Sequence, residues 1–187
     1  VWTWTALDAD SKLLVSYVVS PHRDTESAAQ LLSDLASRLD ELPYITADEL
    51  KSYRADAKQV FGFKHIWMLS QTRKGVDTGH STSYVERHNL TIRMENRRYA
   101  RKTNAYSKML SRHVTMMNLW AVHYNFCRIH STLRTTPAVA TGLADEPHDC
   151  EWIVGLIDAM TMAPKKPGPA VGSKYRPRKT KRRRPER

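Results

Sequence analysis

The spacing of hydrophobic residues divides the first part of the chain into strand-like and helix-like segments. Residues 1–6 alternate aromatic or aliphatic side chains with Thr, and residues 13–19 form a run rich in β-branched and aromatic side chains. A polar link from Asp8 to Ser11 separates the two segments. This pattern predicts an antiparallel hairpin. From Thr25 the period changes to about 3.6 residues, which predicts a helix capped by Asp24 or Thr25. The apolar stripe of this helix comprises Ala28, Leu31, Leu32, Leu35, Ala36 and Leu39.

The middle of the chain continues the alternation of strands and helices. Residues 44–47 predict a short strand closed by Asp48, a helix follows over 49–61, and residues 63–69 again resemble a strand. Residues 70–82 are polar and contain two glycines, which predicts a loop. Strands joined by helical crossovers favour a mixed sheet covered by helices, so the expected fold class is a three-layer α/β arrangement.

The remaining segments predict helices. Ser83 is expected to cap a helix that starts near Tyr84, and Pro137 is expected to open a short helix after Thr136. Two further helices are expected over residues 105–127 and 148–160. The longer one carries Leu110, Val114, Met117, Trp120, Ala121 and Tyr124 on one face.

The charge is distributed unevenly over the 187 residues, whose formal net charge is +11. Residues 164–187 hold eleven basic side chains and one acid, so we expect a folded domain over 1–163 and a disordered basic tail over 164–187. The chain has no apolar run of about 18 residues, which excludes a membrane-spanning helix. Two cysteines, Cys127 and Cys150, are too few for a disulfide scaffold and favour a reducing compartment.

Two acidic residues stand where a metal site would need them. Asp48 follows a predicted strand, and polar residues at that point of α/β sheets often form the site. Glu86 lies in the first turn of a predicted helix. Each residue also has a structural interpretation, Asp48 as a helix N-cap and Glu86 as the acid of a capping box. The two interpretations remain open for both residues.

A basic band accompanies Glu86. Residues 86–134 hold ten Lys or Arg and two acids, which suits a polyanion held over a hydrolytic centre. The alternative is a solvated basic helix face. His123, Cys127 and His130 have spacings that a zinc site could use, but a fourth ligand is missing unless Cys150 reaches them. The segment is better interpreted as a helix end whose Tyr124 and Phe126 pack inward.

Three segments resemble one protein family. The long motif STSYVERHNLTIRMENRRYARKTNAYSK around Glu86 resembles the third-acid region of bacterial insertion-sequence transposases of the DDE type, above all the family of insertion sequence one. The later YNFCRIHSTLRTTPA is similar to the helix end that follows this acid in the family. The short ITADELKSY resembles the strand that carries the second acid. The resemblance covers roughly residues 1 to 160.

The resemblance implies a ribonuclease-H-like fold that lacks its first strand here. It implies a DNA transposition enzyme that cleaves DNA strands and transfers the freed 3′-hydroxyl to a target. Three carboxylates would hold two Mg²⁺ ions, or Mn²⁺ as a substitute, one activating the nucleophile and one stabilising the leaving oxygen. Asp48 and Glu86 would be the second and third acids. DNA contacts would come from Arg87, His88, Arg93, Arg97, Arg98, Arg101, Lys102, Arg128 and His130.

The chain departs from the family pattern at two points. The strand that carries the first acid would precede residue 1, and the only nearby acids, Asp8 and Asp10, fall in the predicted hairpin turn. Glu49 stands where family members commonly have Gly. We therefore expect the 187 residues alone to be inactive as an enzyme, and a non-catalytic DNA-binding remnant of a transposase is the alternative.

The resemblance also sets expectations for partners and location. The partners would be the DNA of the element ends and of the target, together with further copies of the protein in a synaptic complex. The location would be the bacterial cytoplasm, in association with the nucleoid. The resemblance indicates no membrane partner.

Overall fold

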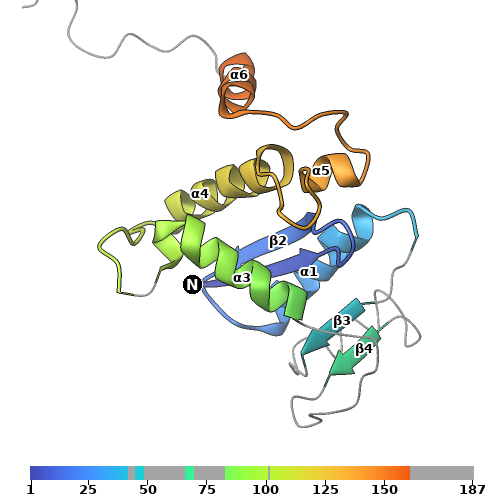
Figure 1. Cartoon of the computed structure of the whole chain (residues 1–187). Helices are drawn as coiled ribbons and strands as arrows, with labels where there is room; N and C mark the ends of the chain where they lie inside the picture. Colours follow the sequence, from blue (N-terminus) through green and yellow to red (C-terminus); the bar gives the residue numbers. More distant parts are fainter. Residues whose placement is uncertain (42–44, 49–65, 70–82, 101, 161–187) are drawn as a thin grey trace, which may run out of the picture.

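The computed structural model describes residues 1–41, 45–48, 66–69, 83–100 and 102–160 (Figure 1). The predicted helix over 49–61, the predicted loop over 70–82 and the basic tail lie outside these residues. Everything said below about structure concerns the described part of the chain.

The N-terminal hairpin is present as predicted. Strand β1 (Trp2–Leu7) pairs antiparallel with β2 (Leu14–Ser20), with Trp2 opposite Ser20 and a register shift between Ala6 and Leu7. Successive side chains of a strand point to opposite faces, so each strand contacts two different layers. Trp4 and Val18 face one layer, while Tyr17 faces the other.

Helix α1 (Thr25–Ser37) covers the first of these faces. Its N-cap is Asp24, whose carboxylate accepts a hydrogen bond from the Ser27 N–H at 3.0 Å. Ala36 and Leu39 of the predicted apolar stripe are partly buried, and its other four residues are buried: Ala28, Leu31, Leu32 and Leu35. Ala28 is fully covered beside Trp4 and Leu31. The helical period in the sequence therefore identified the packed face correctly.

A second pair of strands lies beside the same helix. Strand β3 (Ile45–Asp48) pairs parallel with β4 (Ile66–Leu69), with Asp48 opposite Leu69. Ile45 packs on Leu32 and Leu35 of α1, and the same cluster contacts the hairpin. The mixed α/β content is confirmed, although no pairing joins the two strand pairs into one sheet within the residues that the structure describes.

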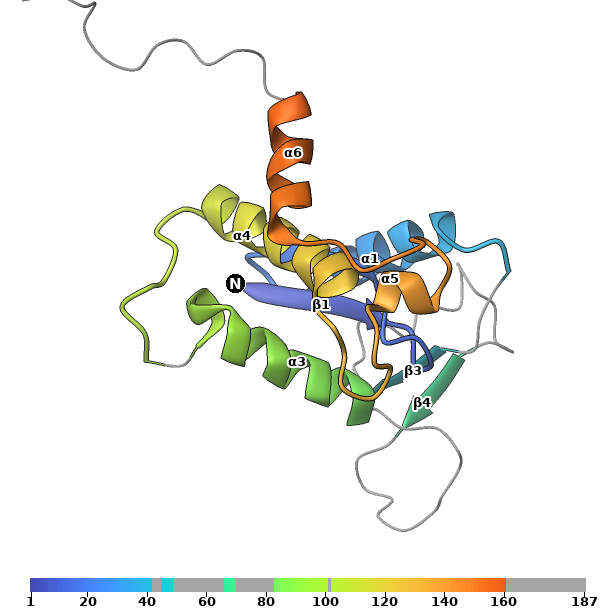
Figure 2. The ribbon, with the colours of Figure 1, turned by 45° about the horizontal axis from the view of Figure 1, so that its top comes forward.

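Helices α3 (Ser83–Glu95) and α4 (Leu110–Val122) pack against each other and against the hairpin. A 3-10 turn (Arg97–Tyr99) follows α3, and a π-helical turn (His123–Cys127) continues α4. The two helices share a core that packs on Leu7, Tyr17 and Val19 of the hairpin, whereas α1 contacts Trp4 and Val18. In Figure 2, α3 lies on the side of β1 away from α1. The shared core consists of Leu14, Ile92, Met117, Trp120, Ala121 and Tyr124.

The predicted helix over 105–127 is shorter at its beginning than expected. Residues 102–109 form turns instead, and Met109 has an extended backbone that precedes the first helical residue, Leu110. Two local hydrogen bonds stabilise the turns, from the Ala105 N–H to the Thr103 hydroxyl at 3.0 Å and from the Arg98 guanidinium to the Ser107 hydroxyl at 2.7 Å. Short polar side chains that bind nearby backbone compete with helix formation in this way.

Two short helices complete the described chain. Helix α5 (Pro137–Ala140) begins with the predicted Pro after the capping Thr136, and α6 (Cys150–Met160) begins two residues later than expected. Asp149 accounts for this start, because its carboxylate accepts a hydrogen bond from the Trp152 N–H at 2.8 Å. Helix α6 projects away from the rest of the fold in both views (Figures 1 and 2). Among the described helices, none has the length and apolarity to cross a membrane.

Candidate functional site

The two predicted acids belong to neighbouring elements. Asp48 is the last residue of β3, and Glu86 lies in the first turn of α3. In both views the end of β3 lies beside the beginning of α3 (Figures 1 and 2). The carboxyl end of β3 and the amino end of α3 are therefore neighbours, and we call this place the corner formed by β3 and α3.

Helix α3 separates its residues into an inner and an outer face. His88 and Ile92, followed by Asn96 directly after the helix, recur every four residues and are buried. Glu86 and Arg93 are seven residues apart, which is about two turns, so they share the outer face. Both are exposed to solvent. The helix therefore carries a negatively charged and a positively charged side chain on the same exposed face.

His88 lies in the core instead of on the DNA-accessible surface that the sequence suggested. The residue is 2 % exposed, and its ring meets Tyr124 edge-on at 4.8 Å and Trp120 at 5.5 Å between centroids. Neither ring nitrogen has a hydrogen-bond partner in the described part of the chain. Burial, with the positive charges of Arg128 and His130, lowers the pKa of His88 to about 4. We therefore leave His88 out of the DNA-contacting set.

Arg128 takes part in a network that the sequence did not reveal. Its Nε lies 2.5 Å from Glu95 Oε1, and its guanidinium lies 5.7 Å from the centroid of the Tyr124 ring. The other Glu95 oxygen accepts a hydrogen bond from the Trp120 indole N–H at 3.1 Å. Glu95 thus links the end of α3 to α4 and to the segment after the π-helical turn. The side chains of Glu95 and Arg128 are each 30 % exposed, so this pair borders the solvent.

His130 is half-buried near the same network. Its main chain pairs with Thr135, and its carbonyl accepts a hydrogen bond from the Arg134 N–H at 2.8 Å. Burial lowers the pKa of His130, and the charges of Arg128, Lys12 and Arg87 lower it further. The lowered pKa favours the neutral imidazole, so His130 contributes less positive charge to the predicted DNA-binding set.

The other predicted basic residues lie mainly on the surface. Arg87, Arg93, Arg97 and Lys102 are exposed, whereas Arg98 is half-buried and donates a hydrogen bond to Ser107. Arg101 lies outside the described residues. The exposed members therefore remain available to a polyanion.

Asp8 has a structural role in the hairpin turn. Its carboxylate accepts hydrogen bonds from the N–H and the hydroxyl of Ser11, the former at 2.9 Å. Burial alone would raise the pKa of Asp8, but these hydrogen bonds outweigh it and the pKa is lowered. The placement agrees with the predicted turn, and both contacts tie the Asp8 carboxylate to Ser11.

No metal centre is formed by the side chains that the structure describes. Within these residues, no three His, Cys, Asp or Glu side chains lie close enough together to hold a metal ion. The predicted zinc spacing of His123, Cys127 and His130 therefore does not form a site. Instead Tyr124 is buried in the core, and Phe126 packs against Trp152 at 5.5 Å, as the inward-packing interpretation predicted.

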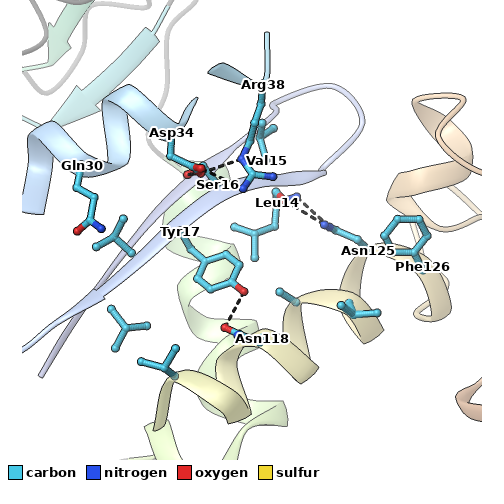
Figure 3. Close-up of a pocket in the computed structure, with 15 residues that line it drawn as sticks. Leu14, Val15, Ser16, Tyr17, Gln30, Asp34, Arg38, Asn118, Asn125 and Phe126 are labelled. Carbon is cyan, nitrogen blue, oxygen red and sulfur yellow. Dashed lines mark hydrogen bonds and ion pairs between the residues drawn. The ribbon is translucent and has the colours of Figure 1, made fainter. Parts of the chain in front are cut away.

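A cavity of about 510 Å³ lies along the edge of β2 that faces away from β1 (Figure 3). Helices α1 and α4 form its walls. On one wall Asp34 binds Ser16 and Arg38, and on the other Tyr17 donates a hydrogen bond to Asn118 at 2.9 Å. None of the predicted site residues lines this cavity, so it is separate from the corner formed by β3 and α3.

Comparison with known proteins identifies a family for this chain. The family model of the IS1 transposase matches residues 1–126, which include Asp48, Glu86 and every described element up to the π-helical turn. No curated protein and no solved structure matches the chain. The general function of this family is DNA transposition, with DNA as the partner. Because the match covers 126 of the 187 residues, the chain belongs to the IS1 transposase family.

Proposed function

We propose that this chain forms most of the catalytic domain of a DDE transposase. The complete domain cleaves DNA strands and transfers them to a target with the help of divalent metal ions, whereas the 187 residues alone are inactive. Asp48 and Glu86 provide two of the three catalytic carboxylates. One observation carries the proposal: both acids lie within the matched residues 1–126, at the end of β3 and the start of α3, which lie side by side (Figure 1).

The arrangement of strands supports a ribonuclease-H-like fold for this domain. The cluster around Leu32 and Leu35 of α1 contacts Ala6 and Val15 of the hairpin and Ile45 of β3. One helix face thus covers both strand pairs, as expected if they belong to one layer. We propose that a further strand lies between β1 and β3, and that this strand carries the first acid.

The donor chemistry fits a hard divalent cation. Asp48 and Glu86 would hold Mg²⁺, or Mn²⁺ in its place, because both ions prefer carboxylate oxygen ligands. The bound ions would supply a nucleophile at neutral pH and stabilise the leaving oxygen. Glu86 is exposed on α3, so a metal ion held by its carboxylate could also bind a phosphate oxygen of DNA.

The exposed basic residues would position the DNA. Arg93 shares the outer face of α3 with Glu86, and Arg97 follows directly after the helix. Cationic side chains next to an acidic metal site hold the phosphates without reading the sequence. Arg87 and Lys102 are exposed as well and belong to the same proposed surface.

A transposition assay in a bacterial host tests the proposal. The coding sequence is supplied with its natural flanking DNA, and the frequency of new insertions is counted. Asp48→Asn and Glu86→Gln should each lower this frequency at least roughly 100-fold, since even changes around metal ligands cost 10- to 100-fold. The matched controls Asp10→Asn and Glu151→Gln, both at exposed positions, should leave it unchanged.

The second candidate is a non-catalytic DNA-binding remnant. It is supported by the lack of a cluster of three acidic or other ligand side chains among the described residues, and by the basic surface that remains. An unmodified sequence that gives no insertions but binds duplex DNA with a steep salt dependence would favour the remnant. Insertions that persist in Asp48→Asn and Glu86→Gln would contradict the catalytic proposal.

A further inference from the structure

The turn between β1 and β2 brings Lys12 to the beginning of α3. The Lys12 ammonium lies 3.6 Å from the centroid of the Tyr84 ring, and Tyr84 belongs to the first turn of the helix, as Glu86 does. In both views the turn of the hairpin lies beside the amino end of α3 (Figures 1 and 2). A cation is attracted by the negative face of an aromatic ring, so Tyr84 holds the ammonium at this place.

The backbone of Lys12 is held in an unfavourable conformation. Its φ is +60°, in the left-handed region, which Gly, Asn and Asp adopt more readily than other residues. Two hydrogen bonds fix the residue: its N–H donates to the Asp8 carbonyl at 3.0 Å, and its carbonyl accepts from the Tyr124 hydroxyl at 3.1 Å. A turn that only joins two strands favours Gly, Asn or Asp here, so a Lys at this position indicates a role for its side chain.

Two other segments bring further positive charge to the same place. Besides burial, which has the largest effect, the charges of Arg128, Lys12 and Arg87 lower the pKa of His130, so all three lie near this imidazole. Arg87 belongs to α3, whereas Arg128 and His130 follow the π-helical turn. The Nδ1 atom of His130 is buried without a hydrogen-bond partner among the described residues. Three segments far apart in the sequence therefore place basic side chains around one point.

Carboxylates leave two of these side chains unpaired. Arg128 binds Glu95, but neither Lys12 nor Arg87 takes part in an ion pair between residues that the structure describes. The pKa of Asp8, which burial alone would raise, is lowered mainly by its hydrogen bonds from Ser11 and least by the charge of Lys12. Lys12 and Arg87 are therefore available to an anion.

We propose that Lys12, together with Arg87 and His130, binds a phosphate group of the DNA at the amino end of α3. The inference rests on the proposed function, in which DNA lies at Glu86, and adds to it a residue of the hairpin turn. The ammonium and the guanidinium supply charge and N–H donors to the phosphate oxygens, and the imidazole supplies one further N–H. Tyr84 is a positioning residue that holds the ammonium. Because phosphate contacts carry no sequence information, this site positions the DNA strand and reads no bases.

Fluorescence anisotropy of the full chain with a duplex oligonucleotide in EDTA tests the proposal, because no divalent metal ion is then bound. Lys12→Asn should weaken binding roughly three- to tenfold at low salt and reduce the slope of log K against log salt by about 0.9. Asn suits the left-handed backbone, so the thermal midpoint followed by circular dichroism should be unchanged or raised. A purely structural role of Lys12 would not separate affinity from stability in this way. Lys12→Arg keeps the charge and should restore the slope.

Lys108→Asn is the matched control. Lys108 is exposed and precedes the start of α4, whereas Tyr124, which binds Lys12, follows the end of α4. A helix of 13 residues, about 20 Å long, therefore separates the two lysines, and the control should leave the slope unchanged. Tyr84→Leu should weaken binding at least roughly twofold, because the ammonium loses the ring that holds it, and Tyr84→Phe should restore it.

Three outcomes would overturn the proposal. Lys12→Asn could leave affinity and slope unchanged, or Lys108→Asn could reduce the slope equally. Losses that add fully in the double variant Lys12→Asn, Arg87→Asn would show two separate phosphate contacts, because residues that share one partner are not additive. A chain that gives no insertions in the transposition assay but loses DNA affinity in Lys12→Asn would contradict the proposed catalysis and support this site, so the two failures are distinguishable.

Discussion

The side chain of Asn125 binds both main-chain groups of Leu14, which precedes it by 111 residues. Its amide oxygen accepts a hydrogen bond from the Leu14 N–H, and its amide nitrogen donates one to the Leu14 carbonyl, each at 3.0 Å (Figure 3). The amide thereby imitates one residue of a neighbouring β-strand. The π-helical turn His123–Cys127 carries Asn125, so this contact fastens the end of α4 to the edge of β2.

Replacement of Asn125 should destabilise the fold. Asn125→Leu leaves the N–H and the carbonyl of Leu14 without these partners, which should lower the free energy of unfolding by about 2 kcal/mol. The control Asn118→Ala removes an exposed contact with Tyr17 and should change it by less than about 0.5 kcal/mol. Urea unfolding curves measure both. Equal effects of the two substitutions would contradict the role assigned to Asn125.

The buried His88 should make stability depend on pH. Its pKa is about 4 in the folded chain against the ordinary 6.5, because burial and the nearby Arg128 and His130 disfavour the charged ring. Below pH 6.5 the unfolded chain gains a proton that the folded core does not, so stability falls as the pH falls toward 4. At pH 5 the loss from this residue should be about 2 kcal/mol.

His88→Phe should remove this contribution. The difference in unfolding free energy between pH 7 and pH 5 should shrink by about 2 kcal/mol in the variant. Other residues with lowered pKa, such as His113 and His130, keep their part of the pH dependence. Ile92→Leu is a core control that should change stability without changing its pH dependence. An unchanged pH profile in His88→Phe would show that His88 is not protected from protonation.

Asp8 should affect stability, whereas Asp48 should affect catalysis. Asp8→Asn weakens the hydrogen bonds from Ser11 and should cost about 1–2 kcal/mol in unfolding free energy. Because the pKa of Asp8 is lowered, its stabilising effect is present above the ordinary value of 3.8 and is lost as the pH falls below it. The exposed Asp10 is the control. Transposition lost in Asp8→Asn while the protein remains folded would instead identify Asp8 as a catalytic acid.

Arg93 and Arg97 should contribute to the salt dependence of DNA binding. If each neutralises one phosphate, Arg93→Ala and Arg97→Ala should each reduce the slope of log K against log salt by about 0.9 on duplex DNA. Arg38→Ala is the matched control, since Arg38 is held by Asp34 at 2.8 Å on α1. Fluorescence anisotropy at several salt concentrations gives the slopes. If Arg38→Ala reduces the slope of log K against log salt as much as Arg93→Ala does, the effect comes from the overall charge of the protein and not from a phosphate contact.

The sequence by itself determined the local elements and the family. The strand pattern of the hairpin and the helical period of α1 depend on neighbours two to four residues away, so they are visible in the order of residues. The motif around Glu86 indicated the family, and the match over residues 1–126 confirmed it. The inward face of α3 was also visible in principle, because His88, Ile92 and Asn96 are spaced by four residues.

Only the tertiary structure decided which polar residues face inward and which bind one another. Glu95 with Arg128, and Asn125 with Leu14, are separated by many residues, and no local pattern predicts such pairs. His88 has the same residue type as a DNA-contacting histidine, yet packing against Trp120 and Tyr124 places it in the core. The exposure of Val154 and Met160 on α6 likewise follows from how the described helices pack and not from a local pattern. A side chain is buried only when helices and strands from distant parts of the chain pack around it. Its burial therefore depends on tertiary contacts, which the local order of residues does not show.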